Sequence, residues 1–184
     1  MKRLFLIILL TTLVFAGAAA QIGAQQLTAA ELSFTFTRQS GTSSNQFAIW
    51  IENAQGQFIK TIYATRYTAN GGWKRRASSL PVWVRKSGLS GLNNAQVEAL
   101  TGATPRTGSH SYFWDGTDNR GTPVPAGDYV IFLEGTLRRE NQVMYRAPIR
   151  LGRGPETPEV TVVYTGDSGV ERTMIGNVTV RTLR

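Results

Sequence analysis

The chain of 184 residues contains no cysteine and only one histidine, His110. The absence of cysteine excludes disulfide bonds, thiolate zinc sites and a thiol nucleophile. A single histidine cannot supply the cluster of imidazoles that many catalytic metal sites need. Charged residues are also scarce, at 17%, whereas hydrophobic residues make up 41%. This composition excludes an intrinsically disordered chain and allows one folded domain.

The first residues have the pattern of a secretory signal peptide. Lys2 and Arg3 precede an apolar stretch over residues 4–15, and small residues follow up to Ala20. The apolar stretch is short for a membrane span, so we expect cleavage after Ala20 or after Ala24. The alternative is a retained N-terminal anchor. Loss of the two basic residues leaves a net charge of 18 − 12 = +6, on a protein that we expect in the periplasm.

The rest of the chain has a period of two, which predicts strands with one buried face. Apolar side chains occupy alternate positions in the sets Leu32, Phe34, Phe36; Phe47, Ile49, Ile51; and Tyr129, Ile131, Leu133. Further strands are predicted over residues 57–63, 143–151, 160–164 and 174–180, and Pro148 indicates an edge strand or a bulge. Turn residues separate these segments. The fold class predicted is all-β, an antiparallel β-sandwich of the immunoglobulin-like or fibronectin-like kind.

The predicted organisation is a signal peptide (1–20), a flexible leader (21–30) and a single β-sandwich domain (31–184). We expect one short helix over residues 94–100, with Asn93 or Asn94 as its N-cap. The last two strands are expected to form a hairpin over residues 159–182.

Residues 64–92 do not fit the strand pattern and are interpreted as a long insertion between strands. Seven basic residues and no acidic residue lie between Lys60 and Lys86. Positive potential together with aromatic side chains favours a surface that docks an anionic partner. The candidate docking residues are Trp73, Lys74, Arg75, Arg76, Trp83, Arg85 and Lys86. The alternative is a solvated loop whose aromatic side chains pack onto the sandwich. A surface that binds nucleic acid would use the same residue types, but an exported protein seldom meets nucleic acid.

The stretch from Trp114 to Tyr129 is a polar turn between two strands. Asp115, Asp118, Asn119 and Asp128 offer hard oxygen ligands, so calcium binding is one interpretation. The other is that these side chains cap turns with their own backbone while Trp114 fills the core. Because the spacing of an EF-hand is absent, we predict no metal site and a buried Trp114.

A serine-histidine-aspartate triad is the enzyme hypothesis that the neighbourhood of His110 suggests. Ser109 and Ser111 flank His110, and Asp115 lies five residues after His110. Adjacent residues of a strand point to opposite faces, and triads are defined by geometry rather than by sequence proximity. We therefore predict no catalytic residue and interpret His110 as a surface side chain.

The Trp114-Asp115-Gly116 turn and the strand start Pro125-Ala126-Gly127-Asp128-Tyr129 resemble the Ig-like domain of flagellar hook-capping proteins. Over residues 47–151 the chain resembles more fully a family of predicted periplasmic proteins of unknown function. The segments that carry this resemblance are residues 47–52, 58–61, 80–85, 101–105 and the turn over 114–129. Members of that family are often encoded beside PepSY-type membrane reductases and FMN transferases. The resemblance implies periplasmic redox partners.

The segment Thr101-Gly102-Ala103-Thr104 resembles the acceptor site of FMN transferases, in which the last threonine receives FMN through a phosphoester. The usual aspartate three residues before the first threonine is Glu98 here, and Ala99 stands where glycine is common. The alternative is a helix C-cap, with Gly102 in the left-handed conformation after the short helix.

Three functions are compatible with these observations. The first is a non-enzymatic periplasmic module that binds a membrane or periplasmic redox protein through the basic aromatic insertion. The second is an electron carrier with FMN attached to Thr104. The third is a periplasmic enzyme, for which the sequence offers the weakest support.

Overall fold

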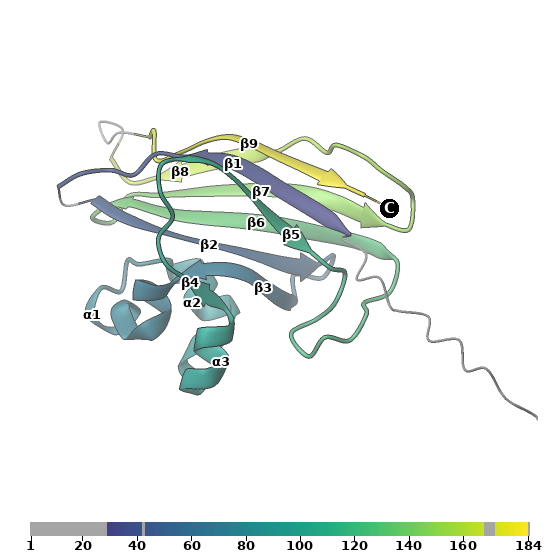
Figure 1. Cartoon of the computed structure of the whole chain (residues 1–184), viewed down its shortest axis with the longest axis horizontal. Helices are drawn as coiled ribbons and strands as arrows, with labels where there is room; N and C mark the ends of the chain where they lie inside the picture. Colours follow the sequence, from purple (N-terminus) through teal and green to yellow (C-terminus); the bar gives the residue numbers. More distant parts are fainter. Residues whose placement is uncertain (1–28, 42, 168–171, 184) are drawn as a thin grey trace, which may run out of the picture.

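The computed structural model describes residues 29–41, 43–167 and 172–183. Its strands form two facing sheets, one with the order β5-β1-β9 and one with the order β4-β3-β2-β6-β7-β8 (Figure 1). The predicted all-β sandwich is therefore confirmed, whereas its likeness to immunoglobulin-like domains stays a prediction. The strands are β1 (Ala30–Phe36), β2 (Ser43–Asn53), β3 (Phe58–Thr65), β4 (Thr101–Gly102), β5 (Gly108–Trp114), β6 (Gly127–Arg138), β7 (Gln142–Leu151), β8 (Thr161–Thr165) and β9 (Ile175–Thr182).

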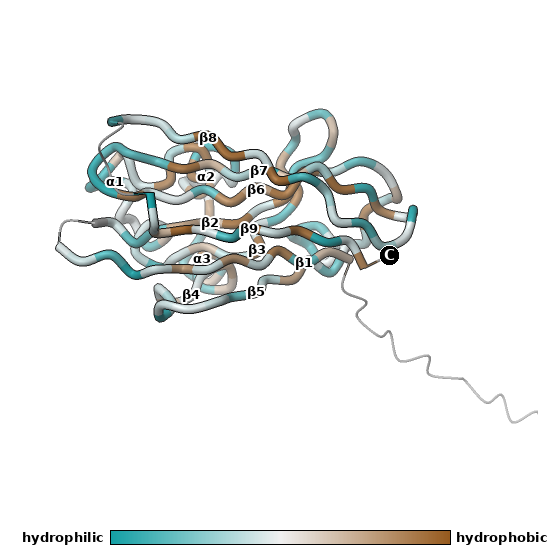
Figure 2. Tube along the Cα trace, turned by 90° about the horizontal axis from the view of Figure 1, so that it is seen from above, coloured by the Kyte–Doolittle hydropathy of each residue, from teal (hydrophilic) through white to brown (hydrophobic). Residues whose placement is uncertain are grey.

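The alternating side chains of the strands build the core between the two sheets. Phe34 and Phe36 of β1 and Phe47 and Ile49 of β2 are at most 2% exposed and belong to one apolar cluster. Phe34 meets Phe47 edge-on, with ring centroids 5.3 Å apart. In Figure 2 the hydrophobic segments lie along the strands, whereas the connections at the ends are mostly hydrophilic. Period-two alternation thus placed the buried face correctly.

Part of the outer face of the large sheet, over β2, β3 and β6, is also buried, because the insertion between β3 and β4 covers it. The predicted loop is folded into helical turns: η1 (Thr68–Gly72, a π-helical turn), α1 (Trp73–Arg75), α2 (Pro81–Lys86) and η2 (Leu89–Gly91, a 3-10 turn), followed by α3 (Asn94–Ala99). Trp50 stacks on Phe132 at 5.0 Å on this face, and Trp83 and Leu80 pack in the same second cluster. Strand β2 is therefore buried on both faces, which alternation alone does not reveal.

Helix α3 confirms the predicted short helix. The Asn93 side chain accepts a hydrogen bond from the backbone N–H of Gln96, and the Gln96 side chain accepts one from the backbone N–H of Asn93. This reciprocal pair is a capping box, which satisfies two backbone donors at the start of the helix. The predicted N-cap is thereby resolved in favour of Asn93.

The predicted C-terminal hairpin is wrong. β8 pairs with β7 in the large sheet, whereas β9 pairs with β1 in the small sheet. Residues 166–174 separate the two strands, a longer connection than the two to five residues typical of a hairpin. The chain uses this length to cross from one sheet to the other. Ser168 and Gly169 of the predicted turn lie outside the described residues.

The N-terminal boundary is also earlier than predicted. The signal peptide, the two expected cleavage positions and residues 21–28 lie outside the described residues. Ala29 and Ala30, expected at the end of a flexible leader, are at most 6% exposed. The backbone N–H of Ala29 donates to the carbonyl of Trp114, and its carbonyl accepts from Leu183. These bonds anchor the start of β1 to both neighbouring strands of the small sheet.

Pro148 does not mark an edge strand, because β7 lies between β6 and β8, but it stands where β7 is unpaired on one side. It pairs with Val130 of β6 on one side of β7. On the other side, β8 pairs only with β7 residues 142–146, so Pro148 lies beyond its end. Proline has no N–H to donate, and this position requires none for a ladder with β8.

Candidate functional site

A large share of the described basic residues lies at one end of the sandwich, which we call the basic end. It is formed by the described parts of five connections, residues 37–41, 66–79, 103–107, 138–141 and 166–167 with 172–174, which the strand register brings together. Its cations are Arg38, Arg66, Lys74, Arg75, Arg76, Arg106, Arg138, Arg139 and Arg172. The described acidic residues of the same connections are Glu140 and Asp167.

Hydrogen bonds fix these connections to one another. The backbone N–H of Arg38 donates to Thr107 Oγ1 at 2.9 Å. The Arg76 guanidinium and the Ser78 hydroxyl both donate to the carbonyl of Arg139. Lys74, Arg75 and Arg139 are exposed and make no ion pair with another described residue. Hydrogen bonds between side chains and backbone groups of different connections therefore hold the basic end in place. The charged groups of Lys74, Arg75 and Arg139 remain exposed to solvent.

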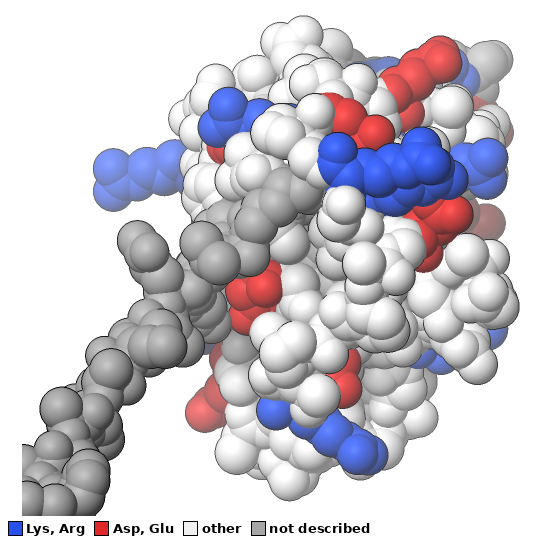
Figure 3. Space-filling model, turned by 90° about the vertical axis from the view of Figure 1, so that its right-hand side faces the viewer, with Lys and Arg blue, Asp and Glu red and all other residues white. Residues whose placement is uncertain are grey.

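The opposite end of the sandwich carries charges of both signs, which Figure 3 shows interspersed. Ion pairs between described residues gather there: Lys60–Asp115, Lys86–Glu52, Arg150–Asp128 and Arg181–Glu31. Burial alone would raise the pKa of Asp115, but hydrogen bonds from Lys60 and Thr117 lower that pKa to about 2. Because these cations are neutralised by partners, the net positive charge of the chain is concentrated at the basic end.

The Thr101–Thr104 segment lies at the edge of the large sheet and leads into the basic end. Thr101 and Gly102 form β4, which pairs in parallel with Ala64 and Thr65 of β3. Ala103 is exposed and Thr104 is half-buried. The Tyr63 hydroxyl donates to the carbonyl of Ala103 at 2.6 Å.

Gly102 does not cap the helix, so that alternative is wrong. α3 ends at Ala99, and the next residue, Leu100, is right-handed. Gly102 lies instead against Tyr63: a Cβ at position 102 would approach the Tyr63 ring to 2.5 Å. Close packing of a ring, rather than backbone conformation, explains the glycine. The two threonines also differ, because the Thr101 hydroxyl is buried without a hydrogen-bond partner in the described part of the chain.

The structure brings together only part of the predicted docking set. Trp73, Lys74, Arg75 and Arg76 lie at the basic end, and Arg85 is exposed on α2. Lys86 lies at the opposite end, where its ammonium donates to Glu52 and to the carbonyl of Gly56.

The assignment of Trp83 to the docking surface is wrong. The residue is 0% exposed, and its indole N–H donates to Thr61 Oγ1 at 3.0 Å. The side chain therefore fills the space between α2 and the large sheet and cannot contact a partner. The direction of the Trp83 side chain is set by the packing of one face of α2 on the sheet. A stretch of basic and aromatic residues in the sequence does not indicate which face of such a helix is buried.

Residues 28–168 match a family model described as predicted periplasmic protein (DUF2271). The chain belongs to this family. The match includes the insertion, the Thr101–Thr104 segment and the turn after Trp114, which are the features that carry the resemblance in the sequence. No curated protein and no solved structure matches the chain. No helix within the described residues is long and apolar enough to cross a membrane.

In this DUF2271 chain the turn after Trp114 is held by its own acidic side chains. Asp118 accepts hydrogen bonds from the backbone N–H groups of Arg120 and Thr122 at 2.8 and 2.9 Å. Asp115 binds Lys60 and Thr117, and Asp128 is paired with Arg150. These contacts are the turn-capping arrangement that the sequence offered as the alternative to calcium binding. Trp114 is 1% exposed, as predicted.

His110 takes part in the architecture of the basic end. Its Nε2 lies 2.7 Å from the carbonyl oxygen of Arg106, and its ring lies 6.4 Å from that of Phe34. Ser111 points to the outer face, where its hydroxyl meets that of Ser33. No serine donates to the imidazole within the described chain. The contact between His110 and the carbonyl of Arg106 therefore stabilises the connection that follows Thr104.

Glu134 was not singled out from the sequence, in which it alternates with the core residues of β6. It is 0% exposed because α2 covers it. Its carboxylate accepts hydrogen bonds from the backbone N–H groups of Val82 and Trp83 at 3.1 and 2.7 Å. Burial raises the pKa of Glu134 to about 7, although these bonds act in the opposite direction. The apolar neighbours on its face, Val130 and Phe132, were the available signal of a covered surface.

Proposed function

We propose that the chain is a periplasmic accessory module that docks onto an anionic surface of a redox protein through its basic end. The observation that carries the proposal is the segregation of charge. Basic residues far outnumber acidic residues among the described residues of the basic end, whereas the ion pairs lie at the other end, among charges of both signs. Such an arrangement orients a protein as it approaches an anionic partner and accelerates association.

The class of partner comes from the resemblance, which implies PepSY-type membrane reductases as neighbours. A module of this kind needs no catalytic residues of its own. Lys74 and Arg75 are adjacent on α1, and Arg139 is held beside Arg76 by the insertion. These side chains form the contact surface that we assign to the partner.

The test is a pair of matched charge reversals. Lys74→Glu with Arg75→Glu changes the basic end, and Arg120→Glu with Arg153→Glu makes the same change in net charge at the opposite end. Binding to a purified PepSY-type reductase is measured at low and moderate salt. We expect at least about a tenfold loss of affinity for the first pair only, and a decline of wild-type binding with salt. Equal losses for the two pairs would contradict docking at the basic end.

A second candidate function is electron transfer through FMN attached to Thr104. The specific observation in its favour is the difference between the two hydroxyls of the segment. Thr104 is half-buried beside the exposed Ala103, whereas the Thr101 hydroxyl is buried. The exposed Ala103 leaves room for an approaching enzyme, and Arg66 and Arg106 of the basic end favour a phosphate group nearby. Bound FMN would supply a redox-active ring, which the chain itself lacks.

Valine replacements at Thr101 and Thr104 test which of the two threonines is the FMN acceptor. The chain is co-expressed with an FMN transferase, and the intact mass and visible absorption are measured. We expect FMN on the wild type and on Thr101→Val, and none on Thr104→Val. A wild type without FMN, or a Thr104→Val variant that retains it, would overturn this candidate and leave the docking proposal standing.

A further inference from the structure

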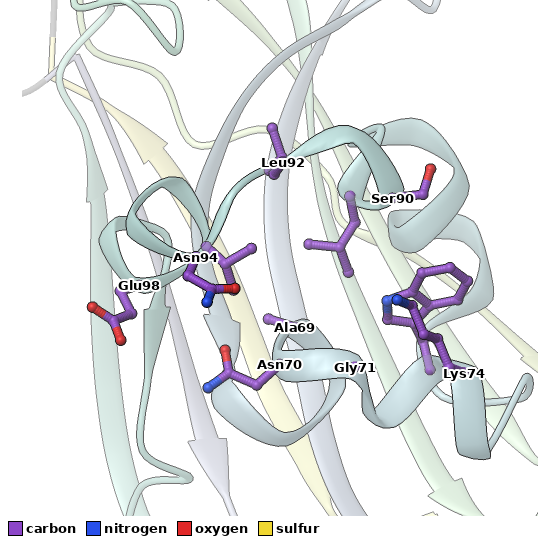
Figure 4. A pocket seen from close by; sticks show the side chains of 11 residues that line it. Ala69, Asn70, Gly71, Lys74, Ser90, Leu92, Asn94 and Glu98 are labelled. Atoms are coloured by element: carbon purple, nitrogen blue, oxygen red, sulfur yellow. The ribbon is translucent and has the colours of Figure 1, made fainter.

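The insertion contains a cavity that borders the proposed docking surface at Lys74. It has a volume of about 330 Å³ and lies between η1, α1, η2 and α3, on the side of the insertion away from the sheet (Figure 4). Its floor consists of Ala69, Leu89 and Val97, which are at most 8% exposed and belong to the second apolar cluster. Because the floor is part of a packed core, the cavity is preformed.

Polar side chains surround this apolar floor. Figure 4 shows Asn70 and Asn94 directed toward one another across one part of the cavity, with Ser90 and Lys74 on the other side. The side chains of Asn70, Asn94 and Ser90 make no hydrogen bond with another described residue. By contrast, the side-chain oxygen of the neighbouring Asn93 caps α3. Unused donors and acceptors around a hollow are the ordinary composition of a small-ligand site.

The charges and shape of the rim define the class of ligand. Lys74 and Glu98 carry opposite charges, so the rim has no net formal charge. Amide and hydroxyl groups provide both donors and acceptors, which is what a hydroxyl group of a ligand also requires. Trp73 adds an indole wall that is half-buried against the second cluster. A neutral molecule with many hydroxyl groups and one apolar face satisfies all of these features.

We infer that this cavity binds a sugar ring. Its C–H face would lie on the apolar floor and Trp73, and its hydroxyl groups would bond to Asn70, Asn94 and Ser90. A volume of about 330 Å³ is at the lower end of ligand pockets, which suits a monosaccharide or one unit of a longer chain.

Trp73 provides a specific reporter of binding. The other three tryptophans are at most 1% exposed, and their indole N–H groups donate to Glu52, Thr61 and the carbonyl of Thr117. The Trp73 indole N–H makes no hydrogen bond with a described residue. Its resonance in a ¹⁵N–¹H spectrum is therefore identified by fast exchange with water and by its loss in Trp73→Phe.

The experiment titrates the labelled protein with glucose, N-acetylglucosamine and maltose, and separately with glycylglycine. We expect a saturable shift of the Trp73 indole resonance with at least one sugar, while the three buried indole resonances stay in place. Asn70→Ala and Asn94→Ala should each weaken binding about threefold to tenfold, the equivalent of one hydrogen bond. Gln55→Ala, an exposed change at the β2–β3 turn, should have no effect.

Three results would overturn the inference. One is the absence of a saturable Trp73 shift with all three sugars. The second is a saturable shift with glycylglycine, which would assign the cavity to peptides. The third is a sugar-induced shift that survives both asparagine variants. The buried indole resonances report in each sample that the variant is folded, so a lost shift cannot be attributed to unfolding.

Discussion

Glu134 of β6 accepts a hydrogen bond of 2.7 Å from the backbone N–H of Trp83, the residue that fills the space between α2 and the large sheet. One carboxylate thus links the insertion to the sandwich at the first turn of α2. The link is a buried ionisable group, with its pKa raised to about 7. The attachment of the insertion should therefore depend on pH.

The first prediction concerns this dependence. The ordinary pKa of 4.5 applies to the unfolded chain, so between pH 4.5 and 7 the folded state holds a proton that the unfolded state has lost. Stability from this group is consequently present below pH 4.5 and is lost as pH rises toward 7. The shift of roughly 2.5 pH units corresponds to about 3 kcal/mol.

Urea unfolding at pH 5 and pH 7.5 measures the effect. The wild type should be less stable at pH 7.5, and Glu134→Gln should lose most of this difference because it does not ionise. Glu140→Gln, on the exposed β6–β7 turn, is the matched control and should behave like the wild type. A pH difference that persists in Glu134→Gln would show that another group is responsible.

The second prediction concerns Trp114. It is 1% exposed, packs edge-on against Tyr129 at 5.2 Å and donates to the carbonyl of Thr117. Trp114→Ala should lower the free energy of unfolding by about 3–5 kcal/mol. Phe113→Ala, at the neighbouring position, should cost less than about 0.5 kcal/mol because Phe113 is 55% exposed. Similar unfolding midpoints for the two variants would refute the assignment of Trp114 to the core.

The third prediction concerns the contact between Gly102 and Tyr63. A Cβ on residue 102 would lie 2.5 Å from the ring, so Gly102→Ala should displace Tyr63 and cost about 1–3 kcal/mol. Gly91→Ala is the control, since no atom lies within 4 Å of a Cβ there. Thermal unfolding of both variants gives the comparison, and equal midpoints would mean that the ring moves aside freely.

The fourth prediction concerns export. The pattern from Lys2 to Ala20 leads us to expect a mature N-terminus at Gln21 or Gln25 in the periplasmic fraction. Intact mass measurement of fractionated protein distinguishes the two positions. Full-length chain beginning at Met1 in the cytoplasmic fraction would contradict the signal peptide.

Local patterns predicted local features well. The alternation of Leu32, Phe34 and Phe36 gave a strand with the correct buried face, and Asn93 gave the start of α3, because side-chain direction and capping depend on near neighbours. The direction of Trp83 could not be obtained in this way. Its burial depends on the sheet beneath α2. The sequence around a tryptophan in a basic stretch is the same whether the side chain faces a partner or the core.

The sequence by itself determined an exported pattern, an all-β sandwich and a buried Trp114, since period-two alternation and turn residues act within a few positions. Only the tertiary structure decided that β8 and β9 join different sheets and that Glu134 is covered. It also decided that Arg38, Arg76 and Arg139, far apart along the chain, share one end. Strand pairing is non-local: alternation specifies which face of a strand is buried, but not which strand lies beside it.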